Sequence, residues 1–132
     1  MQIKRETDYA IRCVYYLAGK EQDMVMMDEV AKEMIIPRSF AAKILQKLVH
    51  AGIVESFQGI RGGFRLARKS NEITLYDVLQ AIEGPITLNL CTEDAMACDL
   101  SQTCKVHPFW VSVRRQVEDI LRRITFAAMR TL

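Results

Sequence analysis

The chain has 132 residues, of which 50% are hydrophobic and 26% are charged. This length matches one domain and excludes a multidomain enzyme, while the composition excludes a disordered chain. The formal charge of +2 is too small by itself to indicate a nucleic-acid partner. The first residues lack the apolar run of a signal peptide and no stretch is long enough to span a membrane, so we expect a cytoplasmic (cytosolic) protein.

Apolar residues at helical spacing predict three helices in the first part of the chain. They are expected over residues 7–18, 28–34 and 38–50. We expect the Thr7 hydroxyl to cap the first helix and Asp28 to cap the second. Pro37 separates the second from the third, because a proline disfavours helical conformation at the residue before it. The third helix is predicted to have a buried apolar face and a polar, basic face.

After residue 52 the pattern changes from helical to extended. Residues 53–57 and 64–67 flank a stretch rich in glycine, which predicts a β-hairpin. Another helix is expected from Thr74 to Glu83, where Asp77 completes a capping box. A long helix is expected from Pro108 towards the C-terminus, with an apolar stripe on one face. The stripe comprises Val113, Val117, Ile120, Leu121, Ile124 and Ala128.

The near-neutral total hides a strongly basic segment. Residues 38–70 carry seven positive charges against Glu55 alone, a net charge of +6. The other segments carry −2 (residues 1–37), −5 (residues 71–107) and +3 (residues 108–132). The basic charge therefore coincides with the predicted third helix and the hairpin.

Two short helices joined by a tight turn and followed by a hairpin are the parts of a winged helix-turn-helix. A helix fits the major groove of DNA, and a hairpin tip reaches the neighbouring minor groove. A single exposed lysine has no diagnostic value because such residues are common, but the combination predicts DNA binding. The candidate DNA contacts are Arg38, Ser39, Lys43, Gln46 and Lys47 on the helix and Arg61, Gly62 and Gly63 at the tip.

Cys91, Cys98 and Cys104 lie within fourteen residues of one another, and His107 follows closely. In the cytosol such clusters are more often metal ligands than disulfides. Three thiolates and an imidazole suit zinc, copper(I) or an iron-sulfur cluster, and the lack of paired C-x-x-C motifs disfavours zinc. Reduced structural cysteines and a redox disulfide are the alternatives. Cys13 is interpreted as a core residue of the first helix.

Four stretches together resemble one family of bacterial regulators. They are the opening MQIKRETDYAIR, the helix-turn-helix MDEVAKEMIIPRSFAAKILQKLVHAGIVES, the wing QGIRGGFRLA and the three-cysteine loop. The chain is similar, over nearly its whole length, to the winged helix-turn-helix iron-sulfur transcriptional regulators that include IscR and NsrR. The resemblance implies a homodimeric transcription factor.

The resemblance also implies that Cys91, Cys98 and Cys104 hold an iron-sulfur cluster completed by a non-cysteine ligand. His107 sits where the IscR-like proteins, which hold a [2Fe-2S] cluster, have their histidine. Asp8 sits where NsrR-like proteins have an aspartate that the other subunit donates to a [4Fe-4S] cluster. Both residues are present, so the fourth ligand and the cluster type stay open. Asp8 also suits the positive end of the first helix dipole.

We therefore expect a mainly α protein with a small β-hairpin. Its parts are a winged helix-turn-helix DNA-binding domain (residues 1–84), a cysteine-rich cluster-binding loop (85–107) and a dimerisation helix (108–132), in one compact unit. The apolar stripe of the last helix would be a liability in a monomer, which favours a homodimer on a palindromic double-stranded operator.

Two alternatives keep part of this interpretation. The first is a regulator of the same fold without a cluster, controlled by thiol oxidation or by a partner protein. The second is a zinc or electron-transfer module that needs no operator. An enzyme is least expected, because only His50 and His107 are bases near neutral pH and neither has a recognisable nucleophile beside it.

Overall fold

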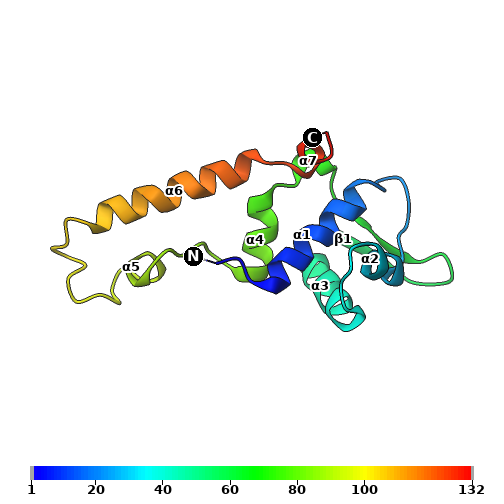
Figure 1. The fold of residues 1–132 in the computed structure, drawn as a ribbon, viewed down its shortest axis with the longest axis horizontal. Helices are drawn as coiled ribbons and strands as arrows, with labels where there is room; N and C mark the ends of the chain where they lie inside the picture. Colours follow the sequence, from blue (N-terminus) through cyan, green and yellow to red (C-terminus); the bar gives the residue numbers. More distant parts are fainter. Residues whose placement is uncertain (1, 132) are drawn as a thin grey trace.

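The computed structural model describes residues 2–131 and consists of a helical body and a projecting arm (Figure 1). The body contains α1 (Arg5–Ala18), α2 (Met27–Glu33), α3 (Arg38–His50), β1 (Val54–Phe57), β2 (Gly63–Leu66), the 3₁₀ turn η1 (Ser70–Glu72), α4 (Leu75–Glu83) and α7 (Phe126–Met129). The arm contains α5 (Leu90–Glu93), α6 (His107–Arg123) and the loop between them. The predicted fold class, mainly α with a small β-hairpin, is confirmed.

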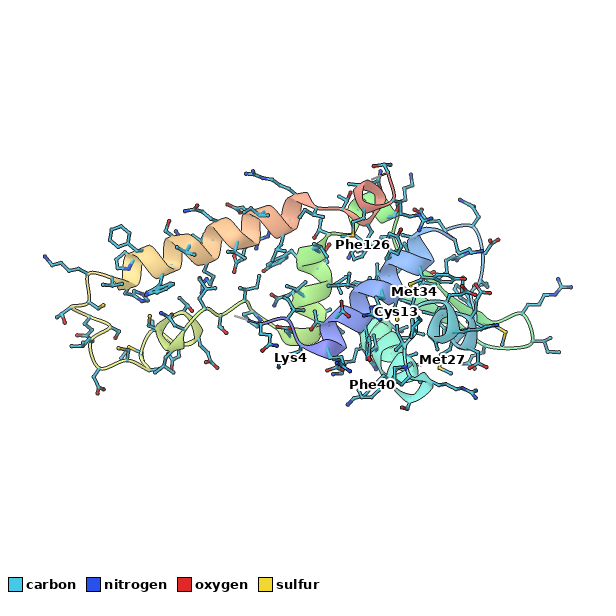
Figure 2. All side chains as sticks on the ribbon, viewed as in Figure 1. Lys4, Cys13, Met27, Met34, Phe40 and Phe126 are labelled. Atoms are coloured by element: carbon cyan, nitrogen blue, oxygen red, sulfur yellow. The ribbon has the colours of Figure 1, made fainter. Side chains whose placement is uncertain are left out.

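Helix α1 is central to the body because its apolar face is completely covered. Ala10, Cys13 and Val14 are 0% exposed and Leu17 is 1% exposed. Their spacing places them on one helical face, which packs with the buried residues of α3 and α4 in a single core. Figure 2 shows Cys13 and Phe126 inside this body. The prediction that Cys13 belongs to the core is confirmed.

The two predicted N-terminal caps are wrong. Helix α1 begins at Arg5, and Thr7 is a fully buried residue within it. The Thr7 hydroxyl donates to Glu83 Oε1 at 2.7 Å, and the backbone N–H of Lys4 donates to the same oxygen at 2.9 Å. Helix α2 begins at Met27, so Asp28 lies in its first turn. The Thr7 hydroxyl is thus used to join α1 to the end of α4, a contact between distant parts of the chain.

The hairpin and the capping box form as predicted. Strands β1 and β2 pair antiparallel, from Val54 opposite Leu66 to Phe57 opposite Gly63. The start of β2 also pairs with Val25 through Phe64. A Cβ at Gly63 would lie 2.7 Å from the Val25 carbonyl oxygen, so only glycine permits this approach.

At the start of α4, Thr74 and Asp77 form the predicted capping box, in which each side chain accepts from the other residue's backbone N–H.

The long C-terminal helix ends earlier than predicted. Helix α6 ends at Arg123, and Ile124 is extended. The Ile124 carbonyl accepts from Leu75 N–H at 2.9 Å, and Phe126 N–H donates to Ile73 O at 3.0 Å. Thr125 then caps the short helix α7. Leaving the helix allows Phe126 to become fully buried in the body, which a continuous helix would not permit.

None of the helices within residues 2–131 has the length and apolar character needed to cross a membrane.

Replacing Phe126 by alanine is expected to lower the free energy of unfolding by about 3–5 kcal/mol, because it empties a fully buried aromatic site. Urea denaturation followed by circular dichroism measures the change. Ile60→Ala, at a fully exposed position, is the control and should change it by less than about 0.5 kcal/mol. A loss below about 1 kcal/mol for Phe126→Ala would mean that the C-terminal segment hardly stabilises the body.

Candidate DNA-binding face and cysteine loop

The outer face of α3 is polar and open. Ser39, Lys43, Gln46 and His50 are exposed, whereas Ala41, Ile44, Leu45 and Leu48 are buried on the opposite face. This division follows the helical spacing predicted from the sequence. The exposed face of α3 therefore presents hydroxyl, ammonium and amide groups in a form that suits a groove of DNA.

Only some of the basic side chains in residues 38–70 are without an ion-pair partner. Four of its seven basic residues have a carboxylate partner; the pairs are Arg38–Asp28, Lys47–Glu6, Arg65–Glu55 and Arg68–Asp77. Among residues 2–131, Lys43, Arg61 and Lys69 have no such partner. The structure thus separates the charges that link elements of the body from those available to an external anion.

Lys47 differs from the other candidate residues of α3. Its ammonium lies 2.6 Å from Glu6 Oε1, and its side chain is 39% exposed. It occupies the flank of α3 that packs against α1, beside the outer face. Phe40, on the same flank, is not among the candidate DNA contacts predicted from the sequence. It is 47% exposed and contacts the Tyr9 ring edge-on at 5.9 Å.

The hairpin tip consists of two glycines, Ile60 and Arg61. Gly59 has a φ of 102°, and Ile60 and Arg61 project from the turn, with Ile60 fully exposed. A Cβ at Gly62 would overlap the Phe57 carbonyl oxygen. Gly62 and Gly63 are therefore required by the hairpin itself, and their contact with DNA stays a prediction.

The three loop cysteines are half-buried free thiols on the arm. Cys91 lies in α5, a short helix that the sequence did not predict, and its thiol donates to Asn89 Oδ1 at 3.4 Å. Cys98 and Cys104 follow in irregular backbone. Within the described part of the chain, no three His, Cys, Asp or Glu side chains are close enough together to hold a metal ion. The sequence spacing brings the thiols into one loop but does not gather them at one point.

His107 and Asp8 have different surroundings. His107 is the first residue of α6, and its Nδ1 is buried without a hydrogen-bond partner in residues 2–131. An unpaired buried nitrogen is costly, and a ligand would satisfy it. Asp8 is exposed on α1, paired with Arg12 at 2.8 Å, and lines an open depression of about 640 Å³. Three thiols and an imidazole nitrogen without a hydrogen-bond partner therefore fit an iron-sulfur cluster in their chemistry.

A sequence profile of a family described as iron-dependent transcriptional regulators, Rrf2, matches residues 3–131. The chain belongs to the Rrf2 family. A candidate HTH-type transcriptional regulator of Aquifex aeolicus is 32% identical over 119 residues, which are 89% of this chain and 83% of that protein. This relative of the Rrf2 chain carries the name of a transcriptional regulator, as the family does, and the resemblance stated from the sequence is confirmed.

Two solved structures have the same fold as this Rrf2 protein. CymR (YrzC), described as the global cysteine regulator of B. subtilis, has a TM-score of 0.81 at 22% identity, over 99% of this chain and 97% of that one. IscR of T. potens has a TM-score of 0.78 at 21% identity, over 99% and 87% of the two chains. The fold is therefore that of the winged-helix Rrf2 regulators.

The four thiols of the reduced, metal-free protein are expected to react in two classes. Burial raises the pKa of Cys13 to about 12, so its thiol stays protonated at pH 8 and very little of the reactive thiolate forms there. Iodoacetamide should therefore add to Cys91, Cys98 and Cys104, and mass spectrometry should count three adducts. Denaturation in guanidinium before the reaction is the control and should give four. Modification of Cys13 in the native protein at the rate of the loop thiols would contradict the burial.

Proposed function

We propose that this Rrf2 regulator binds a palindromic double-stranded operator as a homodimer, and that an iron-sulfur cluster on the cysteine loop controls the binding. The observation that carries the DNA-binding part is that Lys43 on α3 and Arg61 at the hairpin tip have no carboxylate partner among residues 2–131. Lys69 lies in the segment that follows β2 and adds a third such charge. Phosphate contacts by basic residues supply most of the affinity of such complexes.

In this proposal α3 enters the major groove. Ser39, Lys43 and Gln46 meet base edges or phosphates, and Arg61 reaches the adjacent minor groove. Arg38 and Lys47 must exchange Asp28 and Glu6 for phosphates before they contribute. Because each exchange gives up an existing ion pair, we expect smaller effects from these two residues than from Lys43.

The exposed apolar face of α6 supports the homodimer. No residue of α6 is buried, and its apolar side chains include Phe109 at 72%, Trp110 at 41%, Val113 at 43% and Ile120 at 57% exposure. A contiguous apolar surface of this kind is unfavourable in water unless a partner covers it. A second copy would cover it and would present two α3 helices to two half-sites of a symmetric operator.

For the cluster, Cys91, Cys98 and Cys104 would supply three thiolates. The fourth ligand would be His107, through its unpaired Nδ1, or Asp8 of the partner subunit. When bound, the cluster supplies iron that can bind nitric oxide and that can also gain or lose electrons. A fourth ligand weaker than thiolate is more easily displaced, which suits a sensor of nitric oxide, of redox state or of cluster supply.

A second candidate keeps the DNA-binding function without the cluster. The three loop cysteines are free and partly exposed, so they could respond directly to oxidants by forming a disulfide. Control by a partner protein that covers the loop is the other version of this candidate. The iron content of the protein purified without oxygen separates both versions from the cluster.

Lys43→Ala is expected to weaken operator binding and to reduce the slope of log affinity against log salt by about 1, because one phosphate contact is lost. The DNA is obtained by selection from random duplexes, and fluorescence anisotropy measures the affinity at several salt concentrations. Lys20→Ala, on the loop that follows α1, is the matched control and should behave as the parent. If no sequence is enriched, or if affinity does not depend on salt, the DNA-binding proposal is wrong.

The protein purified anaerobically is expected to be brown, with thiolate-to-iron absorption that Cys98→Ala removes and Cys13→Ala retains. Mössbauer spectra of Asp8→Ala and His107→Ala identify the fourth ligand, because only loss of the true ligand changes the iron sites. A colourless, iron-free protein would favour control by thiol oxidation or by a partner. If neither substitution changes the spectrum, both candidates for the fourth ligand fail.

A further inference from the structure

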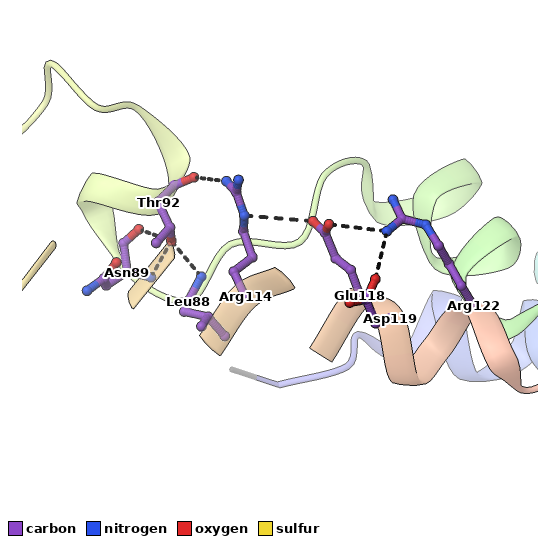
Figure 3. A network of polar contacts seen from close by, with 7 residues as sticks. All are labelled: Leu88, Asn89, Thr92, Arg114, Glu118, Asp119 and Arg122. Atoms are coloured by element: carbon purple, nitrogen blue, oxygen red, sulfur yellow. Dashed lines mark hydrogen bonds and ion pairs between the residues drawn. The ribbon is translucent and has the colours of Figure 1, made fainter. Parts of the chain in front are cut away.

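A series of polar contacts runs from the cysteine loop along α6 (Figure 3). It begins at Thr92, the buried residue that follows Cys91. The Thr92 hydroxyl accepts from the backbone N–H groups of Leu88 at 2.9 Å and Asn89 at 3.1 Å, which fixes Thr92 within α5. Its carbonyl accepts from Arg114 Nη1 at 3.0 Å. Arg114 therefore joins the segment that carries Cys91 to α6.

The next group, Glu118, is shared between two arginines. Its carboxylate oxygens lie 3.7 Å from Arg114 Nε and 3.6 Å from Arg122 Nη1, and its side chain is only 17% exposed. These distances allow electrostatic attraction but are too long for hydrogen bonds. Arg114 Nε is buried and has no hydrogen-bond acceptor within residues 2–131. The Glu118 carboxylate thus lies between two arginines without a hydrogen bond to either.

Arg122 connects this group to the DNA-binding body. Its guanidinium lies 4.0 Å from the centre of the Tyr76 ring on α4, a cation–π contact. The residue after Tyr76 is Asp77, whose carboxylate lies 4.0 Å from Arg68, shortly after strand β2. The contacts therefore reach from the cysteine loop to the base of the hairpin.

We propose that Arg114 is the positioning residue that transmits a change in the cysteine loop to α4. If the loop shifts and the Thr92 carbonyl moves away, Arg114 loses a charge-assisted hydrogen bond. Its remaining partner is Glu118, and closing the 3.7 Å gap draws that carboxylate from Arg122. Arg122 is then left with Asp119, an exposed carboxylate 3.6 Å away, as its acidic partner (Figure 3). Pairing with Asp119 alone draws the Arg122 guanidinium towards the exposed side of α6, and its contact with the Tyr76 ring weakens. This inference rests on the proposed function, because it takes the loop to be the part that senses a signal.

The two possible roles of Arg114, coupling the loop to α4 or only anchoring the loop, predict different behaviour of α4. If Arg114 only anchors the loop, its removal loosens α5 and leaves α4 unchanged. If it couples the two, α4 must respond to the loop in the parent protein and must stop responding when Arg114 is replaced. Local hydrogen exchange of backbone amides measures this response in each segment separately.

The experiment modifies the loop thiols of the reduced, metal-free protein with N-ethylmaleimide and follows hydrogen exchange by mass spectrometry. In the parent, modification is expected to speed exchange in residues 75–83 roughly tenfold, the factor that loss of about one charge-assisted hydrogen bond gives. In Arg114→Gln these residues should exchange as slowly as in the unmodified parent and should not respond to modification, because no arginine at position 114 remains to draw Glu118 from Arg122. Arg115→Gln, the exposed neighbour on α6, is the matched control and should respond as the parent does.

Three results would overturn the proposal. They are no change in residues 75–83 when the parent is modified, a full response in Arg114→Gln, and a lost response in Arg115→Gln. If Arg114→Gln does not fold, as judged by circular dichroism, Glu118→Gln tests the same prediction because it removes the shared carboxylate. No DNA enters the experiment, so its failure leaves operator binding untouched. Failure of the DNA selection likewise leaves this result valid.

Discussion

The covered apolar face of α1 is the constraint on which the rest of the structure depends. Ala10 and Cys13 are small, so α3 and α4 can pack closely around this helix, and Val14 and Leu17 complete the same face. That packing fixes which side of α3 remains open to solvent. The Glu83 carboxylate adds a polar link between the start of α1 and the end of α4. Because the arm leaves the body directly after Glu83, this link also fixes where the arm begins.

The charges of the basic segment have two separate uses. Arg38, Lys47, Arg65 and Arg68 connect elements of the body through carboxylate partners, whereas Lys43, Arg61 and Lys69 have no such partner in the described chain. A net charge of +6 therefore overstates the charge that an incoming phosphate meets. The electrostatic field of the whole basic segment still attracts DNA over a distance. The close contacts with phosphates depend on the few basic side chains that have no ion pair to break.

The arm is built differently from the body. It has a helix with no buried residue, irregular backbone around two of its three cysteines, and a polar network where the body has a hydrophobic core. Such a segment can change its arrangement at lower cost than a packed core, which suits a part that responds to a signal. The contacts of Arg114, Glu118 and Arg122 give it a connection to α4. In this proposal a change in the arm reaches the body at α4, while the core around α1 stays covered.

The sequence by itself determined the elements whose signals are local. The apolar spacing of α3, the glycine-bounded hairpin and the Thr74–Asp77 capping box depend on residues a few positions apart, and the structure confirms all three. Tertiary structure decided what depends on distant partners. Thr7 is buried against Glu83, Lys47 is paired with Glu6, and α6 ends so that Phe126 can enter the core. The spacing of the cysteines placed them in one loop, but bringing them to one centre needs contacts that no local pattern encodes. Local patterns fix backbone conformation, whereas burial and pairing depend on which segments meet in space.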